Sequence, residues 1–271
     1  LSGLENHKIT IDDIVFKIGP RINAAGRMES GRTAVHLLVC RNDKEAKEIG
    51  AAINCHNNDR KNVDKEITKE AIDTVKMETN YHLKKSTVVY NPLWHKGVVG
   101  IVASRLVEAF YRPTIVLTES NGFITGSARS IAGFDLYAAI EQCSEYLENF
   151  GGHMYAAGLT LKKENLGPFC DKFEDVVTKQ ITKDILTPIV NIDTYLDFKQ
   201  ITPKFFRILK QFQPFGPGNL SPVFITENVY DNGNGRLVGS ENGHMKLELI
   251  QEDEPYRYIS AIAFNRAEHY E

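Results

Sequence analysis

The sequence lacks long apolar runs, paired cysteines and a signal sequence. No apolar run approaches the roughly 18 residues needed to span a membrane, so we expect no membrane contact. The N-terminus has neither the basic nor the apolar region that directs secretion. The four cysteines are widely scattered without a Cys-x-x-Cys pair, which is typical of reduced thiols. Together these absences predict a cytoplasmic protein.

A strong net charge and the common catalytic motifs are missing as well. The formal net charge is −3, so any contact with nucleic acid needs a local basic strip rather than bulk charge. The eight histidines are dispersed, and the chain contains no His-Glu-x-x-His, Asp-His-His, Walker or Gly-x-Ser-x-Gly motif. We therefore expect this chain to bind no metal ion itself.

The 271 residues contain enough apolar material for two or three compact units. The first residue is leucine rather than methionine, which suggests a piece of a longer protein. After a short apolar helix at Thr33–Cys40, the segment from about Lys44 to Met77 places apolar residues three or four apart on one stripe. Its opposite face carries charges of both signs, as a solvated surface does. This pattern predicts one long helix that connects two domains.

The middle of the chain alternates strands and helices, which predicts an α/β sheet. The predicted strands are Thr87–Tyr90, Pro113–Thr118, Gly122–Arg129 and Leu159–Leu161, and the predicted helices are Val98–Tyr111, Leu136–Leu147 and about Asn165–Ile181. From about Pro188 the pattern changes to short strands separated by Asn-Gly turns, which predicts a small β-barrel. The chain stops just after a strand, so whether the barrel is complete stays open.

The segment Gly151–Gly158 lies between a predicted helix and a predicted strand. Paired glycines permit a turn and the close approach of a ligand, and the following small residues keep the floor of such a site flat. His153 projects from this floor and is suited to contact a phosphate. A tight turn packed with small residues is the simpler interpretation. Other segments rich in glycine, histidine and arginine favour the functional one.

Two arginines, Arg21 and Arg27, flank small residues after a Gly-Pro pair. This pattern predicts a tight loop that presents guanidinium groups, which suit bidentate binding of phosphate. The alternative is that both are surface residues of a helix, with Asn23 as a turn or N-cap residue. The spacing alone does not decide between the two.

The loop at 91–97 connects a strand to a helix N-terminus, an arrangement that makes an anion site from free backbone N–H groups. His95 and Lys96 would add side-chain donors there. The competing interpretation is a core histidine with Trp94 as a packing residue. Arg129 ends a run of small residues at a strand terminus, which predicts an arginine that faces a phosphate, although a plain surface arginine also fits.

Five segments occur in the order in which they are found in the RecJ family of single-strand-specific DNA exonucleases, part of the DHH/DHHA1 phosphoesterase superfamily. These segments are Gly19–Arg27, Trp94–Leu106, Gly126–Ser130, Gly151–Gly158 and Pro214–Asn219. The Gly-Gly-His motif alone indicates only the superfamily, whereas the five together resemble RecJ over nearly the whole chain. Lys96 and Leu220 stand where the family often has proline, and neither departure removes a proposed phosphate ligand.

The resemblance implies a layout of four parts: the end of a DHH catalytic domain at 1–30, connecting helices at 31–83, an α/β DHHA1 domain with a mixed sheet at 84–185, and an OB-fold nucleic-acid-binding barrel at 186–271. It also implies that the Asp-His-His motif, and the aspartates that hold two Mn²⁺ or Mg²⁺ ions, lie upstream of Leu1. The parent is then expected to be a 5′→3′ single-stranded DNA exonuclease of repair and recombination, and this chain alone to be inactive. A helicase and a single-strand-binding protein are candidate partners.

The resemblance also assigns roles to individual residues. His153 and Arg129 are expected to donate to the phosphate at or beside the cleavage site. The expected substrate-binding residues are Arg21, Asn23, Arg27, Trp94, His95, Arg105, Ser130, Gly151 and Gly152, with Trp94 and His95 stacking on or clamping the terminal nucleotide. Two alternatives remain: a DHHA1 phosphodiesterase for short oligonucleotides or cyclic dinucleotides, and a non-catalytic nucleic-acid-binding module.

Overall fold

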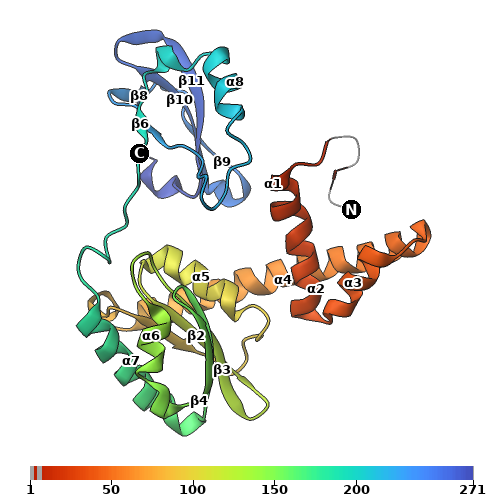
Figure 1. Cartoon of the computed structure of the whole chain (residues 1–271). Helices are drawn as coiled ribbons and strands as arrows, with labels where there is room; N and C mark the ends of the chain where they lie inside the picture. The colour runs from red at the N-terminus through yellow and green to blue at the C-terminus, as the bar shows by residue number, and fades with distance from the viewer. Residues whose placement is uncertain (1–2, 5–7, 271) are drawn as a thin grey trace. The chain divides into compact units, whose positions relative to one another are not determined.

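The computed structural model of the chain describes residues 3–4 and 8–270 and divides into two compact units, 1–188 and 189–271 (Figure 1). Each unit is described by itself. The first contains an N-terminal group of helices and a five-stranded sheet, and the second contains short strands and one helix. No helix in the described ranges combines the length and the apolar character that crossing a membrane requires.

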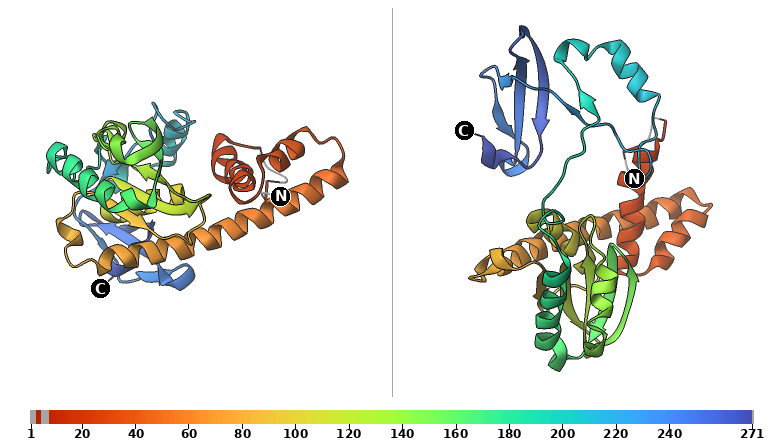
Figure 2. Two further views of the ribbon diagram at one scale, coloured as in Figure 1. Left: turned by 90° about the horizontal axis from the view of Figure 1, so that it is seen from below. Right: turned by 60° about the vertical axis from the view of Figure 1, so that its left-hand side comes forward.

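The N-terminal helices are α1 (Ile11–Asp13), α2 (Gly19–Met28), α3 (Gly31–Val39) and α4 (Asp43–Met77), with a π-helical turn at Ile14–Ile18. Asn42 caps α4 by accepting hydrogen bonds from the backbone N–H groups of Lys44 and Glu45. In Figure 2, α4 runs as one continuous helix from the other N-terminal helices to the sheet. The long connecting helix predicted from the apolar stripe is therefore confirmed.

The tight loop predicted around Arg21 and Arg27 is wrong, because this segment forms helix α2. Its proline, Pro20, comes directly after the π-helical turn Ile14–Ile18, at the start of α2, where the fixed φ of proline suits a helix. Ala24 and Ala25 are fully buried, and Ala25 packs with Ile53 of α4 in one apolar cluster. This burial outweighs the weak helix propensity of the glycines.

The sheet of the first unit has the strand order β1-β2-β3-β5-β4, in which β1 pairs with β2 in parallel and the other neighbours are antiparallel. The strands are β1 (Thr87–Tyr90), β2 (Thr114–Ser120), β3 (Phe123–Arg129), β4 (Leu147–His153) and β5 (Ala156–Leu161). The expected mixed sheet is confirmed.

Helices cover the two faces of this sheet unequally. On one face, α4 and α5 (Val99–Phe110) pack over β1 and β2 through a cluster that includes Ile67, Val102 and Val116. On the other face, α6 (Leu136–Glu141) and α7 (Leu166–Gln180) pack over β2, β3 and β5. Helix α5 also contacts β3, so the described helices of this unit leave the first face uncovered over β4 and β5.

The helix predicted over Leu136–Leu147 is too long, and the predicted helix-to-strand turn at Gly151–Gly158 is wrong. Helix α6 ends at Glu141, and after a 3₁₀ turn the chain enters β4, so that the glycine motif forms a β-hairpin with β5. The ladder to β5 imposes strand structure on residues of low strand propensity.

The second unit contains β6 (Thr194–Tyr195), α8 (Pro203–Lys210), β7 (Phe224–Ile225), β8 (Val229–Asp231), β9 (Arg236–Val238), β10 (His244–Gln251) and β11 (Glu254–Ala263). Strand β10 pairs antiparallel with β8, β9 and β11, and β6 pairs in parallel with β7. The buried Gln251 side chain joins the two groups, because its oxygen accepts from the N–H of Phe198 at 2.9 Å.

Candidate phosphate-binding site

The uncovered part of the sheet is a flat floor of small residues. Directly paired residues of antiparallel strands point to the same face, and two such rows cross β3, β5 and β4. One row is Ser127–Gly158–Gly151 and the other is Arg129–Ala156–His153. All members on β5 and β4 are exposed. Arg129 and His153 therefore lie on one face with only an alanine between them, with Cα atoms roughly 10 Å apart from the spacing of two strand steps.

A cationic pocket opens at one side of this floor. It has a volume of about 250 Å³ and is lined by Arg27, Lys96, Val99, Gly100, Thr125, Gly126, Ser127 and Arg129. Three of these residues carry positive charge, and none of the described residues that line it is a carboxylate. Thr125 and Gly126 also line a second cavity of about 340 Å³, which covers Asn149, Gly151, Gly158 and Thr160. The cationic pocket and the glycine floor are therefore adjacent.

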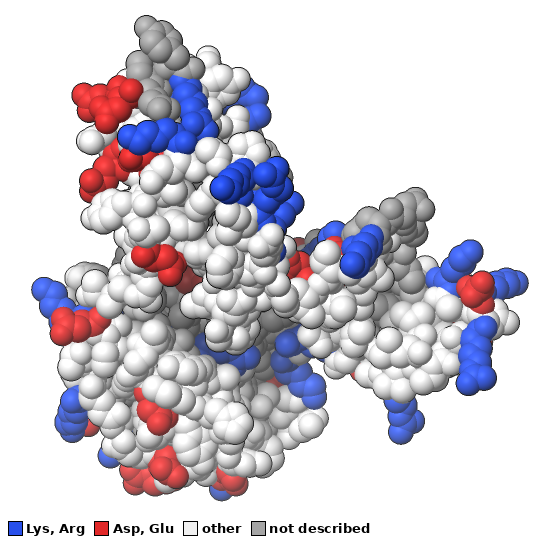
Figure 3. Space-filling model, turned by 45° about the horizontal axis from the view of Figure 1, so that its top comes forward, with Lys and Arg blue, Asp and Glu red and all other residues white. Residues whose placement is uncertain are grey.

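The concentration of positive charge in this pocket is local. On the face that Figure 3 shows, Lys and Arg are scattered with Asp and Glu among them, in keeping with the small net charge. In the pocket, burial lowers the pKa of Arg129, and the positive charge of Arg27 lowers it further. Two guanidinium groups that repel each other in a half-buried site are stabilised by an anion between them.

Hydrogen bonds hold the guanidinium groups of Arg129 and Arg27 in place. Nη1 of Arg129 donates to Oγ of Ser127 at 2.9 Å and to the carbonyl oxygen of Ala128 at 2.8 Å. Nη1 of Arg27 donates to the carbonyl oxygen of Gly97 at 2.9 Å. Val99 and Gly100, the first two residues of α5, also line the pocket, and the first N–H groups of a helix have no partner within it. The site therefore offers an anion both side-chain and backbone donors.

Arg21 and Asn23 do not contribute to this pocket. Nε of Arg21 donates to Oδ1 of Asn54 at 3.0 Å and so ties α2 to α4, and its Nη1 donates to the carbonyl oxygen of Lys17. Asn23 lies exposed in the interior of α2, where it caps neither end. Arg21 and Arg27 are six positions apart on a helix, so they face different directions, and only Arg27 reaches the pocket.

Trp94 is a core residue, so the competing interpretation holds for Trp94, but its core histidine is wrong because His95 is exposed. Its side chain is only 4% exposed, and its Nε1 donates to Oε2 of Glu70 on α4 at 2.9 Å. It therefore does not stack on a nucleotide in this conformation. His95 is exposed, and its Nδ1 accepts a hydrogen bond from the N–H of Gly97 at 3.1 Å. The imidazole folds back over its own loop.

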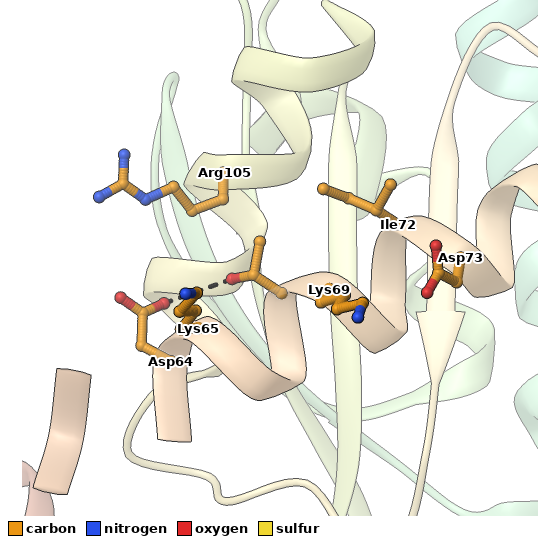
Figure 4. A pocket seen from close by; sticks show the side chains of 7 residues that line it. Asp64, Lys65, Lys69, Ile72, Asp73 and Arg105 are labelled. Carbon is orange, nitrogen blue, oxygen red and sulfur yellow. Dashed lines mark hydrogen bonds between the residues drawn. The ribbon is translucent and has the colours of Figure 1, made fainter. Parts of the chain in front are cut away.

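Two further expected residues have other partners. Nη1 of Arg105 forms an ion pair with Oε2 of Glu108 at 3.0 Å. Figure 4 shows Arg105 projecting from α5 above the Asp64 and Lys65 side chains of α4, at a separate cavity of about 430 Å³. Oγ of Ser130 donates to the carbonyl oxygen of Phe134 at 2.8 Å. Neither residue lines the cationic pocket.

The paired glycines, Gly151 and Gly152, differ in whether the fold leaves room for a side chain. A Cβ atom on Gly152 would lie 2.3 Å from the carbonyl oxygen of Ala156, and its φ of +155° disfavours a side chain, so the hairpin requires glycine there. A Cβ atom on Gly151 would meet nothing within 4 Å. The fold therefore does not require Gly151, whose missing side chain keeps the floor open.

The sequence interpretation missed Ser127 as a site residue, whereas it named Lys96 as a side-chain donor of an anion site. Both line the pocket. Alternation along β3 was the available signal, because Thr125, Ser127 and Arg129 occupy every second position and therefore share a face. Within residues 3–4 and 8–270, no three His, Cys, Asp or Glu side chains come together in a way that could hold a metal ion.

Comparison with known proteins agrees with this architecture. A family model described as "DHHA1 domain" matches residues 84–179, and one described as "RecJ OB domain" matches residues 192–271. The chain belongs to the RecJ family. The single-stranded-DNA-specific exonuclease RecJ of Bacillus subtilis is 34% identical over 99% of this chain, and that of Escherichia coli is 32% identical over 95%. The chain spans 34% and 45% of the length of these two relatives.

Solved RecJ structures share the fold. The crystal structure of RecJ from Thermus thermophilus in complex with Mg²⁺ matches 88% of this chain and 36% of that one, with a TM-score of 0.75 and 27% identity. The complex of the same protein with Mn²⁺ gives a TM-score of 0.74 at 26% identity over 92% of this chain and 35% of that one. The α/β domain, the long helix before it and the OB domain after it are therefore confirmed as the fold class, with the described strands of the OB domain forming two separate hydrogen-bonded groups.

Proposed function

We propose that this chain is the C-terminal part of a 5′→3′ single-stranded DNA exonuclease and supplies the wall of the active-site cleft that binds the DNA phosphates. The observation that carries the proposal is the pocket in which Arg27, Ser127 and Arg129 converge beside a bare glycine floor. A guanidinium pair and a hydroxyl suit phosphate oxygens, and the floor lets the sugar-phosphate backbone approach closely. The RecJ relatives act on single-stranded DNA, according to their names.

In this proposal Arg27 and Arg129 hold one phosphate from two sides, and Lys96 adds charge at the rim. His153 lies across Ala156 from Arg129 and donates to the adjacent phosphate, where negative charge grows as the phosphodiester bond is attacked. Divalent metal ions such as those in the Thermus structures would activate water and polarise that phosphate. The described residues of this chain offer no metal cluster, so we assign metal binding to the DHH domain of the parent protein.

The second unit supports the proposal with an exposed aromatic and basic face. Tyr230 and Tyr258 pair with Ile250 from the two sides, so both rings stand on one face of the sheet, 48% and 59% exposed. Lys246 lies on the same face of β10 and pairs with Arg236 of β9. Aromatic rings with neighbouring cations bind successive bases and phosphates of a single strand.

One acidic residue also lies on this face. Glu248 stands between Lys246 and Ile250 along β10, and its Oε2 accepts hydrogen bonds from the amides of Asn232 and Asn234 at 3.1 and 2.8 Å. These bonds lower the pKa of Glu248, so the carboxylate is satisfied within the domain. We place the path of the strand along the tyrosines and Lys246.

The proposal is tested in two steps. The chain itself, mixed with labelled single-stranded DNA and Mn²⁺, is expected to bind the strand without cleaving it, and robust cleavage would reveal a metal site in this chain. In the parent protein that includes the DHH domain, His153→Ala is expected to lower turnover by about 10²-fold, the scale of losing one donor to a developing charge. Turnover near that of the unaltered protein, with normal DNA affinity, would refute the role of His153.

A phosphodiesterase for short oligonucleotides is the alternative that shares the same pocket. The two differ in the use of the second unit, because a substrate of two or three nucleotides does not need a face for a long strand. We therefore expect affinity to rise as the oligonucleotide is lengthened beyond about four nucleotides, the lower end of the site size of one OB fold. An affinity independent of length would favour the short-substrate enzyme.

A further inference from the structure

We propose that Gly97, in the loop before α5, and Gly100, in the first turn of α5, are positioning residues that set the distance between the two guanidinium groups of the cationic pocket. The inference rests on the proposed function of that pocket. Arg27 comes from α2 and Arg129 from β3, and the loop and first turn around Gly97 and Gly100 lie between them. Each glycine is in contact with one of the two arginines.

Because Gly97 has no side chain, the C-terminal end of helix α2 can pack closely against it. A Cβ atom on Gly97 would lie 2.3 Å from the carbonyl oxygen of Arg27, a distance that real Cβ atoms do not adopt. It would also lie 2.9 Å from Cε1 and 3.0 Å from Nδ1 of His95, whose ring is held there by the N–H of Gly97. The carbonyl oxygen of Gly97 meanwhile accepts the hydrogen bond from Arg27. Gly97 therefore contacts Arg27 twice: its bare Cα leaves room for the backbone of Arg27, and its carbonyl oxygen binds the guanidinium group.

The obstacle at Gly97 is backbone rather than a flexible side chain. A methyl group there would push the C-terminal turn of α2 away from the loop, because a carbonyl oxygen cannot rotate aside without moving its helix. The hydrogen bond from Arg27 to the carbonyl oxygen of Gly97 would be lost with that movement. Alanine at this position should therefore remove Arg27 from the pocket without altering Arg27 itself.

Gly100 makes room for the second arginine. A Cβ atom on Gly100 would lie 3.0 Å from Nη2 of Arg129 and 3.0 Å from Oγ of Ser127. Gly100 is buried within α5, where glycine is less favourable than alanine for the helix. Helix stability therefore does not explain the glycine, whereas the space that it leaves for Arg129 does. Because a guanidinium end is flexible, alanine would displace Arg129 rather than α5.

The two glycines thus predict different signatures. Gly100→Ala should weaken binding of the strand while leaving the unfolding midpoint unchanged or slightly raised. Gly97→Ala should weaken binding and also loosen the contact between α2 and the loop. The matched control is Gly167→Ala near the start of α7, where a Cβ atom would meet nothing within 4 Å and no pocket residue is close in sequence.

The test is a set of double-mutant cycles on the whole chain, with fluorescence anisotropy of a labelled single-stranded oligonucleotide as the readout at fixed salt. We expect Gly100→Ala to lower affinity about tenfold in an otherwise unaltered chain and to have no further effect when Arg129 is already alanine. Gly97→Ala should likewise lower affinity in an otherwise unaltered chain and have no further effect when Arg27 is already alanine. Gly167→Ala should bind as the unaltered chain does.

Each result has a definite meaning. If Arg129→Ala and Arg27→Ala both bind as tightly as the unaltered chain, the proposed function fails and this inference fails with it. If the arginine variants are weakened but Gly100→Ala is not, the inference alone is overturned. An equal loss from Gly100→Ala with and without Arg129 would also overturn it, because the glycine would then act independently of that arginine. Should Gly97→Ala fail to fold, Gly100→Ala still decides.

Discussion

The guanidinium group of Arg27 donates to the carbonyl oxygen of Gly97 at 2.9 Å and so joins the end of α2 to the loop before α5. This contact brings the positive charge of Arg27 close enough to lower the pKa of Arg129. The cationic pocket is therefore assembled from three segments of the chain: the end of α2, the loop and first turn at 96–100, and strand β3. Its binding properties depend on how these segments meet.

The single tryptophan offers an optical test of the core position of Trp94. Because its indole is buried and bonded to Glu70, we expect blue-shifted emission that single-stranded DNA does not quench at saturation. Stacking on a base would instead quench the emission strongly as DNA is added. Trp94→Phe should lower the free energy of unfolding by about 1 kcal/mol through loss of the hydrogen bond, with unchanged DNA affinity.

The adjacent glycines of the hairpin should respond oppositely to the same substitution. Gly151→Ala is expected to keep or slightly raise stability, because its Cβ atom meets nothing, yet to weaken DNA binding by covering the floor. Gly152→Ala is expected to cost about 1–3 kcal/mol, because the new methyl group clashes with Ala156 and the backbone conformation is strained. Thermal unfolding and anisotropy titrations measure both effects. Equal destabilisation by the two substitutions would argue against a free space over Gly151.

The cysteines should differ in reactivity. Burial raises the pKa of Cys143 and of Cys170 to about 11, whereas Cys55 is exposed on α4. At pH 8 a thiol with a pKa near 11 is ionised in only about one molecule in a thousand. We expect iodoacetamide at pH 8 to modify Cys55 in the native chain and to spare Cys143 and Cys170, as mass spectrometry of peptides would show. Rapid modification of Cys143 would mean that the core around it opens.

The same two thiols predict a dependence of stability on pH. A raised pKa means that the folded chain retains protons that the unfolded chain releases, so the stabilisation is complete below pH 9.0 and is lost as the pH rises through about 11. Urea unfolding at pH 8 and pH 10 should therefore show a smaller fall in the free energy of unfolding for Cys143→Ala than for the unaltered chain. Cys55→Ala is the matched control, and an identical fall in all three proteins would contradict the assignment.

The sequence predicted the elements whose patterns are local. The apolar stripe of α4, the β-branched strands β1 and β2, and the strand–loop–helix order around Gly97 were all read from neighbouring residues. Helix α2 was missed because its glycines and proline disfavour helix locally, and the burial of Ala24 and Ala25 that stabilises it is tertiary. Strand β4 was missed because its ladder to β5 holds residues of low strand propensity.

The candidate site likewise combines features that local sequence patterns predict with features that only tertiary structure determines. The motifs identified Arg129, Arg27 and His153 as phosphate ligands to be tested, but only the register of β3, β5 and β4 places Arg129 and His153 on one row. The contact between Arg27 and Gly97 is between residues 70 positions apart, so no local pattern indicates it. Arg21 belongs to the same sequence motif as Arg27, yet its guanidinium group donates to Asn54 instead.

The most direct measurement is the coupling between Arg27 and Arg129 in binding single-stranded DNA. Arg27→Ala and Arg129→Ala should each lower affinity about tenfold, and the double variant should lose less than the product of the two, because both guanidinium groups act on one phosphate. Arg105→Ala, at a separate cavity on the same α5, is the control and should bind normally. Losses that multiply independently, or that are no larger than the loss for Arg105→Ala, would contradict a shared phosphate pocket.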